Sequence, residues 1–183
     1  MTLGDAQNHN RFSSETSKDM ERQILTQVLG QLRFTAPLPE ETLARLAESA
    51  SLRGFPGGTQ LFREGSRNEQ LMIISIGRVG LDMFVPGRGN IRILTLGPGD
   101  VIAWSALLGG GRMTTSAMAL EDTQVVAISA DEVLRTCESN HDFGYYLMHR
   151  VATSLAERLL ATRLQLLDLF AESSAEIPME PQA

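Results

Sequence analysis

The sequence lacks several features that would mark particular classes of protein. It has a single cysteine, which excludes an intramolecular disulfide and favours a reducing compartment. No apolar run approaches the roughly 20 residues that a membrane-spanning helix needs. The first 19 residues are polar and contain no apolar segment of the kind found in secretory signals. We therefore expect a cytoplasmic protein without a membrane partner.

An excess of basic residues is also missing. The formal net charge is -6, and this argues against a direct nucleic-acid partner, because proteins that bind the phosphate backbone usually present a basic face. What is present fits a globular protein: 183 residues suit one domain with terminal extensions, and 43% hydrophobic residues can form a substantial core. The sixteen glycines are typical of a β protein with many turns.

Enzymatic and metal-binding motifs are missing as well. There is no nucleophile elbow, zincin motif or EF-hand loop. Cys137, His141 and His149 follow one another at spacings of four and eight, but Ser139 and Asn140 interrupt the predicted helix between the first two, and no second pair of ligands follows. We therefore expect no metal, no catalytic residue and no enzymatic activity.

Short runs of strand-forming residues occupy the middle of the chain. They cover residues 52–55, 59–62, 71–76, 79–85, 91–96, 114–119 and 123–128, with Gly-Pro or Gly-Gly turns between many of them. Short strands separated at intervals of about 8–12 residues indicate an antiparallel sandwich or barrel. The continuous apolar run 71–74 predicts a strand that is buried on both faces.

Helices are predicted on either side of the strands. Apolar spacing indicates one over residues 20–32 and a second from Pro39. Ser129 and Glu132 form a capping box that begins a short helix. Asn140 or Asp142 can then cap a much longer helix that reaches about Phe170 and spans roughly 40 Å.

The long helix carries an apolar seam that has two interpretations. Heptad spacing relates Met148, Leu155, Thr162 and Leu169 on one position and Ala152, Leu159 and Leu166 on the other. The seam either packs on the chain's own barrel or joins two copies of the chain. We favour a homodimer, because so long a helix with so wide an apolar face exceeds what one barrel can bury.

A glycine-rich stretch precedes a single arginine near the middle of the chain. Gly97 to Asp100 form a tight turn, which Asp100 is expected to hold, and Gly109 to Gly111 lead to Arg112. A cation after such a loop, next to a short helix, predicts a pocket for a small anion. The alternative is that Arg112 pairs with a local carboxylate, Glu64 or Glu121. The three glycines are not followed by the Lys-Ser/Thr ending of a nucleotide triphosphate loop.

Four motifs in this order resemble the cyclic nucleotide-binding domain. They are Phe62-Arg63-Glu64-Gly65, Ile76-Gly77-Arg78-Val79, Leu96-Gly97-Pro98-Gly99-Asp100, and Ser105-Ala106-Leu107-Leu108 leading to Arg112. The resemblance is to the effector domains of the catabolite activator and fumarate-nitrate regulator family, and it covers about residues 38–170. It implies a mainly β fold, an antiparallel jelly-roll-like β-roll, followed by a long dimerisation helix. The expected divisions are a disordered tail at 1–18, helices and β-roll at 19–141, the long helix at 142–170 and a second disordered tail at 171–183.

The same resemblance implies a ligand site. In the family, backbone amides at the start of a short helix and an arginine hold a cyclic phosphate, while a glutamate holds the ribose hydroxyl. These positions correspond to Ala103, Trp104, Ser105 and Ala106, then Arg112, Met113 and Thr114. Trp104 stands in place of the glutamate, and its indole can donate a hydrogen bond but not accept one. Either Trp104 contacts a ligand or it fills the pocket as part of the core.

These departures shape the functional expectation. Ala103 replaces a usual glycine and Met113 replaces a small or hydroxylated residue, so we expect binding of cyclic AMP or cyclic GMP to be weakened or altered, with another small anion as a candidate ligand. We predict a regulatory ligand-sensing module that signals to a protein partner by rearranging its dimer and its long helix. The alternatives are a non-binding dimerisation scaffold and a transcription regulator acting through a separate DNA-binding partner. Only about a dozen residues follow Phe170 in this sequence, so we do not expect a helix-turn-helix there.

Overall fold

The computed structural model describes the backbone of residues 4–175 and the side chains of residues 18–164 and 167. Five helices are present in this range: α1 (Gly4–Gln31), α2 (Glu40–Glu48), α3 (Ser105–Leu108), α4 (Ala130–Ser139) and α5 (His141–Ala175). The eight strands are β1 (Ala50–Phe55), β2 (Gln60–Phe62), β3 (Gln70–Ile76), β4 (Val79–Val85), β5 (Gly89–Leu96), β6 (Val101–Ile102), β7 (Ser116–Ala119) and β8 (Thr123–Ser129).

The strands form two four-stranded antiparallel sheets. The strand orders are β1-β8-β3-β6 in one sheet and β2-β7-β4-β5 in the other. This confirms the predicted antiparallel β-roll with flanking helices and a long C-terminal helix. The sequence indicates seven strands, and the eighth is β6, a two-residue strand that pairs with β3 through Ile73 and Met72. A strand this short has no periodicity of its own by which it could be recognised.

Strand β3 separates two hydrophobic cores. Leu71 and Ile73 face a core formed with the helices, whereas Met72 and Ile74 face the interior of the β-roll. All four are at most 3% exposed, so the prediction of a strand buried on both faces is confirmed. Successive residues of a strand point to opposite faces, which is why one strand contributes to both cores.

The predicted caps define where the last two helices begin. The Ser129 hydroxyl accepts a hydrogen bond from the Glu132 amide at 3.4 Å, which is one half of the predicted capping box. The other half does not form, because the Ser129 amide donates to the Ser49 carbonyl at 3.0 Å. The side-chain oxygen of Asn140 accepts a hydrogen bond from the Phe143 amide at 3.0 Å, so Asn140 caps α5. Both terminal helices are longer than the sequence indicates. Helix α1 includes most of the segment predicted to be a disordered tail, and α5 continues past Phe170 to Ala175.

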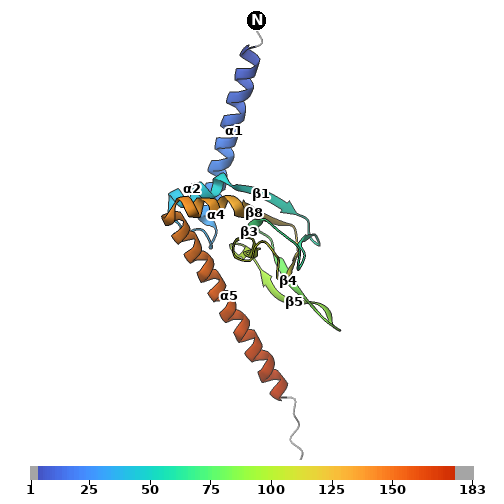
Figure 1. Ribbon diagram of the computed structural model, residues 1–183. Coiled ribbons are helices and arrows are strands. Elements are labelled where there is room, and N and C mark those ends of the chain that lie inside the picture. Colours follow the sequence, from blue (N-terminus) through green and yellow to red (C-terminus); the bar gives the residue numbers. More distant parts are fainter. Residues whose placement is uncertain (1–3, 176–183) are drawn as a thin grey trace, which may run out of the picture.

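Helix α5 divides into a buried and an exposed part. Phe143, Leu147 and Val151 are at most 3% exposed in the helical core, and Met148 and Leu155 pack against it. Arg158 and Ala161 still lie beside the β-roll, and from there α5 extends away from the body of the domain (Figure 1). Its leucines there, Leu159, Leu160, Leu164 and Leu167, are 53–63% exposed. The proximal helix therefore docks on its own domain, and the side chains of Leu166 and Leu169 lie outside the described residues.

Candidate functional site

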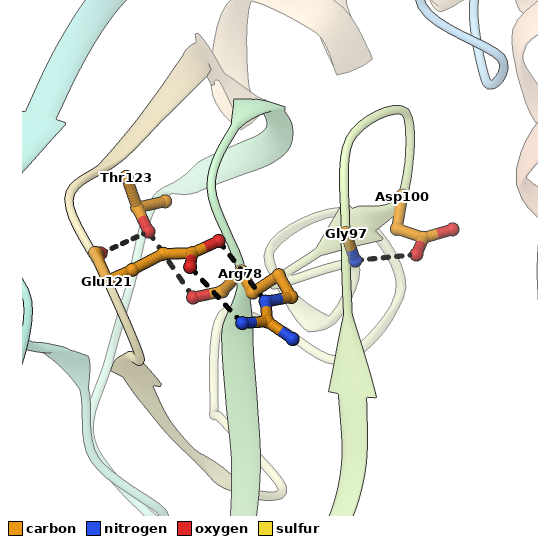
Figure 2. Close-up of polar contacts among 5 residues, drawn as sticks. All are labelled: Arg78, Gly97, Asp100, Glu121 and Thr123. Carbon is orange, nitrogen blue, oxygen red and sulfur yellow. Dashed lines mark hydrogen bonds and ion pairs between the residues drawn. The ribbon is translucent and has the colours of Figure 1, made fainter.

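A tight turn leads from β5 into the candidate site. The carboxylate of Asp100 accepts a hydrogen bond from the Gly97 amide at 2.9 Å (Figure 2). The Asp100 amide also donates to the Gly97 carbonyl at 3.1 Å. Gly99 has a φ of 84°, a conformation that glycine adopts without a steric penalty. This confirms the prediction that Asp100 holds the turn. The chain then passes through β6 to the predicted anion-binding residues.

Ala103 has an unusual backbone conformation. Its φ is 58°, and no other residue except glycine has a positive φ in the described part of the chain. The left-handed region costs a residue with a Cβ roughly 1–2 kcal/mol. The Ala103 side chain is 6% exposed and lies in the core of the β-roll, and its carbonyl accepts a hydrogen bond from Ala106 at 3.0 Å. The fold thus demands a glycine-like conformation at this position.

Trp104 packs on the opposite side of the chain from Ala103. Its half-buried indole contacts the helical core, to which the neighbouring Ala106 and Leu107 also belong. Ala103 belongs to the β-roll core, so the two adjacent residues point into different cores. Trp104 therefore serves as a packing residue of the helical core in this structure.

Helix α3 and the glycine loop form a compact backbone unit. The Ser105 carbonyl accepts hydrogen bonds from the amides of Gly109 at 2.9 Å and Gly111 at 3.0 Å. Ser105 itself is 3% exposed. Among the described residues, the amides of Trp104 and Ser105 donate to no protein acceptor. These two amides are the ones that the start of a helix leaves unpaired.

Arg112 is exposed and has no acidic partner among the described residues. Its Nε donates to the Gly65 carbonyl at 3.3 Å, and it forms no ion pair with any residue that the structure describes. Glu121 instead makes two 3.2 Å contacts to Arg78 at the turn between β3 and β4 (Figure 2). Glu64 accepts a hydrogen bond from the Phe84 amide at 3.0 Å. Both carboxylates considered as partners for Arg112 are therefore engaged elsewhere.

The two residues after Arg112 differ in their exposure. Met113 is 3% exposed and lies in the core of the β-roll, whereas Thr114 is exposed. The predicted site residues thus occupy three environments: the β-roll core (Ala103 and Met113), the helical core and its edge (Trp104, Ser105 and Ala106), and the surface (Arg112 and Thr114). Hydrogen bonds from Gly109 and Gly111 to Ser105 connect the second environment with the loop that carries Arg112.

Two further arginines lie next to this region, and neither is indicated by a local motif. Arg67 forms an isolated antiparallel β-bridge with Arg112. Arg158 of α5 donates a hydrogen bond to the Val101 carbonyl at 2.6 Å. Burial lowers the pKa of the Arg158 guanidinium, and the nearby Asp100 carboxylate opposes this change. Both contacts join residues that are far apart in sequence, so spacing alone gives no sign of them.

Helix α5 is also linked to the same region indirectly, through Arg33 and Phe34. Arg33 forms an ion pair with Asp100 of the turn. Arg150 of α5 donates to the carbonyl of Phe34 at 2.8 Å and to that of Arg33 at 3.0 Å. The segment before the candidate site is therefore connected to α5 both directly and through the end of the N-terminal helical region.

Other chemistry has little support in the described part of the chain. No group of three or more histidine, cysteine, aspartate or glutamate side chains there is arranged to hold a metal ion. Cys137 packs against the helical core, and burial raises the pKa of its thiol. Within the same residues, no helix combines the length and the apolar composition needed to cross a membrane.

Comparison with known proteins identifies the fold family. Residues 52–140 match the family model of the cyclic nucleotide-binding domain. The chain belongs to this family. The matched range begins in β1 and ends after α4, so it contains α3, the glycine loop and Arg112. The family is one of ligand-binding regulatory domains rather than of enzymes.

Individual relatives agree with this assignment. The cyclic AMP receptor protein of Thermus thermophilus is 29% identical over 114 residues, which cover 62% of this chain and 51% of that protein. The chain thus spans about half the length of this relative. A candidate cyclic nucleotide-binding protein of Geobacter metallireducens is 30% identical, with a TM-score of 0.62 and coverage of 70% and 92% of the two chains. A cyclic nucleotide-binding domain of Methylobacillus flagellatus shares the fold, with a TM-score of 0.70, 19% identity and coverage of 82% and 84%.

Proposed function

We propose that this cyclic nucleotide-binding domain is a regulatory sensor whose small anionic ligand binds at Arg112. The observation that carries the proposal is the exposed Arg112 guanidinium, which has no acidic partner among the described residues. The amides of Trp104 and Ser105, which lack protein acceptors, supply further donors in the same segment. A guanidinium and backbone amides together suit a phosphate or another small oxyanion.

We further propose that the site binds cyclic AMP and cyclic GMP weakly or in an altered manner. No carboxylate is present in α3, and Trp104 packs on the helical core. A ribose hydroxyl would therefore lack the hydrogen-bond acceptor that a glutamate supplies in the effector domains of the catabolite activator family. The loss of a buried hydrogen-bond partner costs about 1–3 kcal/mol, which lowers affinity roughly tenfold to a hundredfold.

The proposed output runs through α5. Arg158 contacts the Val101 carbonyl, two residues before Ala103. Movement of the segment 101–112 would therefore change the position of α5 relative to the β-roll. The four exposed leucines of the distal helix support a homodimer, because a soluble domain rarely leaves so many large apolar side chains unpaired on one helix. A protein partner in the cytoplasm would then respond to the position of the paired helices.

A thermal-shift screen tests the binding proposal. The panel contains cyclic AMP, cyclic GMP and other small anions, and a true ligand should raise the melting temperature of the wild-type protein. Arg112→Ala should abolish that increase. Arg53→Ala is the matched control, since Arg53 is also exposed and without an ion pair in the described part of the chain, but lies on β1. A protein that responds to nothing in the panel would instead be a dimerisation scaffold, the alternative supported by the packing of Trp104 and Met113 into the two cores.

A further inference from the structure

The bridge between Arg67 and Arg112 places two arginines opposite each other. Two hydrogen bonds flank the pair: the Asn68 amide donates to the Gly111 carbonyl, and the Met113 amide donates to the Ser66 carbonyl, both at 2.9 Å. This pattern makes Arg67 and Arg112 a non-hydrogen-bonded antiparallel pair. In such pairs the side chains leave the same face and lie closer together than in the hydrogen-bonded type.

Neither arginine is neutralised within the described part of the chain. Both are exposed, and the five ion pairs found there involve other arginines. Two carboxylates belong to the same segment as Arg67, yet Glu64 accepts from the Phe84 amide, and Glu69 forms no ion pair with any described residue. Like charges directly opposite each other in a β pair are destabilising, so the bridge is held against electrostatic repulsion.

The glycine loop that precedes Arg112 carries no side chain at Gly110 and Gly111, and the space at Gly110 is open. Gly110 and Gly111 have φ values of 61° and 79°; a Cβ built on Gly110 would meet no atom within 4 Å, whereas one built on Gly111 would lie 3.2 Å from the Asn68 carbonyl oxygen. An anion approaching Arg112 therefore meets no side chain from Gly110 or Gly111. The planar guanidinium groups of two arginines can each donate two parallel hydrogen bonds to phosphate oxygens.

We propose that Arg67 and Arg112 form a two-arginine clamp that selects a small-molecule phosphate monoester over a cyclic phosphodiester. A monoester carries a charge of about -2 at neutral pH, so it can neutralise both guanidinium groups. The phosphodiester of a cyclic nucleotide has a single negative charge and leaves one arginine uncompensated. The clamp rests on the proposed function of Arg112 and adds the charge class of its ligand.

AMP and cyclic AMP provide a matched pair of probes, since they share base and sugar and differ in the phosphate. Isothermal titration calorimetry on the full chain should show AMP binding at least about tenfold more tightly than cyclic AMP. Arg67→Ala should weaken AMP binding by about tenfold and change cyclic AMP binding by less than about threefold. Arg67→Lys, which retains the charge but not the planar fork, should give an intermediate loss. Arg53→Ala should match the wild-type protein, and circular dichroism verifies that each variant is folded.

The possible results separate the clamp from the site itself. Equal AMP affinity in wild type and Arg67→Ala, or tighter binding of cyclic AMP than of AMP, would overturn the clamp. If Arg112→Ala nevertheless abolishes cyclic AMP binding, the proposed ligand site at Arg112 stands and only the two-arginine clamp is excluded. Inorganic phosphate should compete with AMP in the wild-type protein. Absence of binding by both AMP and inorganic phosphate would also overturn the clamp.

Discussion

Arg158 of α5 donates a 2.6 Å hydrogen bond to the main-chain carbonyl of Val101, two residues before the strained Ala103. This contact connects the long helix directly to the segment that enters the candidate site. Arg33 and Arg150 reinforce it through Asp100 and the carbonyl groups of residues 33 and 34. A change in the site therefore has a short physical route to α5.

Removal of the Arg158 side chain should loosen this connection. We expect Arg158→Ala to lower the free energy of unfolding by about 1–3 kcal/mol, because a charged hydrogen-bond donor and its packing are lost. Urea denaturation measures this change, and hydrogen exchange should become faster around Val101. Arg163→Ala is the control, since Arg163 is an exposed arginine farther along the same helix. If both variants unfold alike, within about 0.5 kcal/mol of the wild type, the contact does not tie α5 to the domain.

The backbone at residue 103 should favour glycine over any residue with a branched side chain. Ala103→Gly removes the steric cost of a φ of 58° but increases the conformational entropy of the unfolded chain. We therefore expect the free energy of unfolding to stay the same or to rise by up to about 1 kcal/mol. Ala103→Val should lower it by about 2 kcal/mol or more, because a β-branched residue is poorly tolerated at positive φ. Thermal and urea unfolding of the two variants test this. A large loss of stability in Ala103→Gly would contradict the left-handed backbone conformation of residue 103.

A charge on the exposed side of the distal helix should break the proposed dimer. Leu159 is 53% exposed, so Leu159→Asp should halve the mass measured by light scattering without unfolding the monomer. Ala161→Asp is the control, because Ala161 lines a cavity against Leu94 and Asp100 of the chain's own β-roll. An unchanged dimer mass in Leu159→Asp would exclude this seam, and a wild-type monomer would exclude the dimer altogether.

The thiol of Cys137 should react slowly while the protein is folded. Burial raises its pKa, so less of the reactive thiolate is present near neutral pH than in an exposed cysteine. The same shift stabilises the fold at lower pH, and this contribution is lost as the pH rises through the pKa of the folded protein. Titration with a colorimetric thiol reagent should be slow for the native protein and rapid in denaturant. Rapid reaction of the native protein would contradict the partial burial of the thiol, and Cys137→Ala supplies the background rate.

The sequence predicts most of the fold because its signals are local. Glycine turns separate the strands, Ser129 caps α4, and the run 71–74 is apolar on both faces. The site is less predictable, because the partners of its residues come from distant segments. Nothing near Arg112 in sequence indicates its pairing with Arg67, and nothing near Trp104 decides which of two cores it joins. The Arg67–Arg112 pairing and the packing of Trp104 depend on strand register and on how the helices dock. The spacing of residues along a single sequence does not determine either of these.

Direct titration of the Arg112 site tests the central claim, that this domain binds an anionic ligand there. Isothermal titration calorimetry with cyclic AMP and with AMP should be carried out on wild type, Arg112→Ala and Arg53→Ala. We predict saturable binding of at least one of the two nucleotides by wild type and Arg53→Ala, and a loss of at least about tenfold in affinity in Arg112→Ala. Binding that is unaffected by Arg112→Ala would contradict the account. So would the absence of binding by either nucleotide together with no response to the other small anions of the thermal-shift panel.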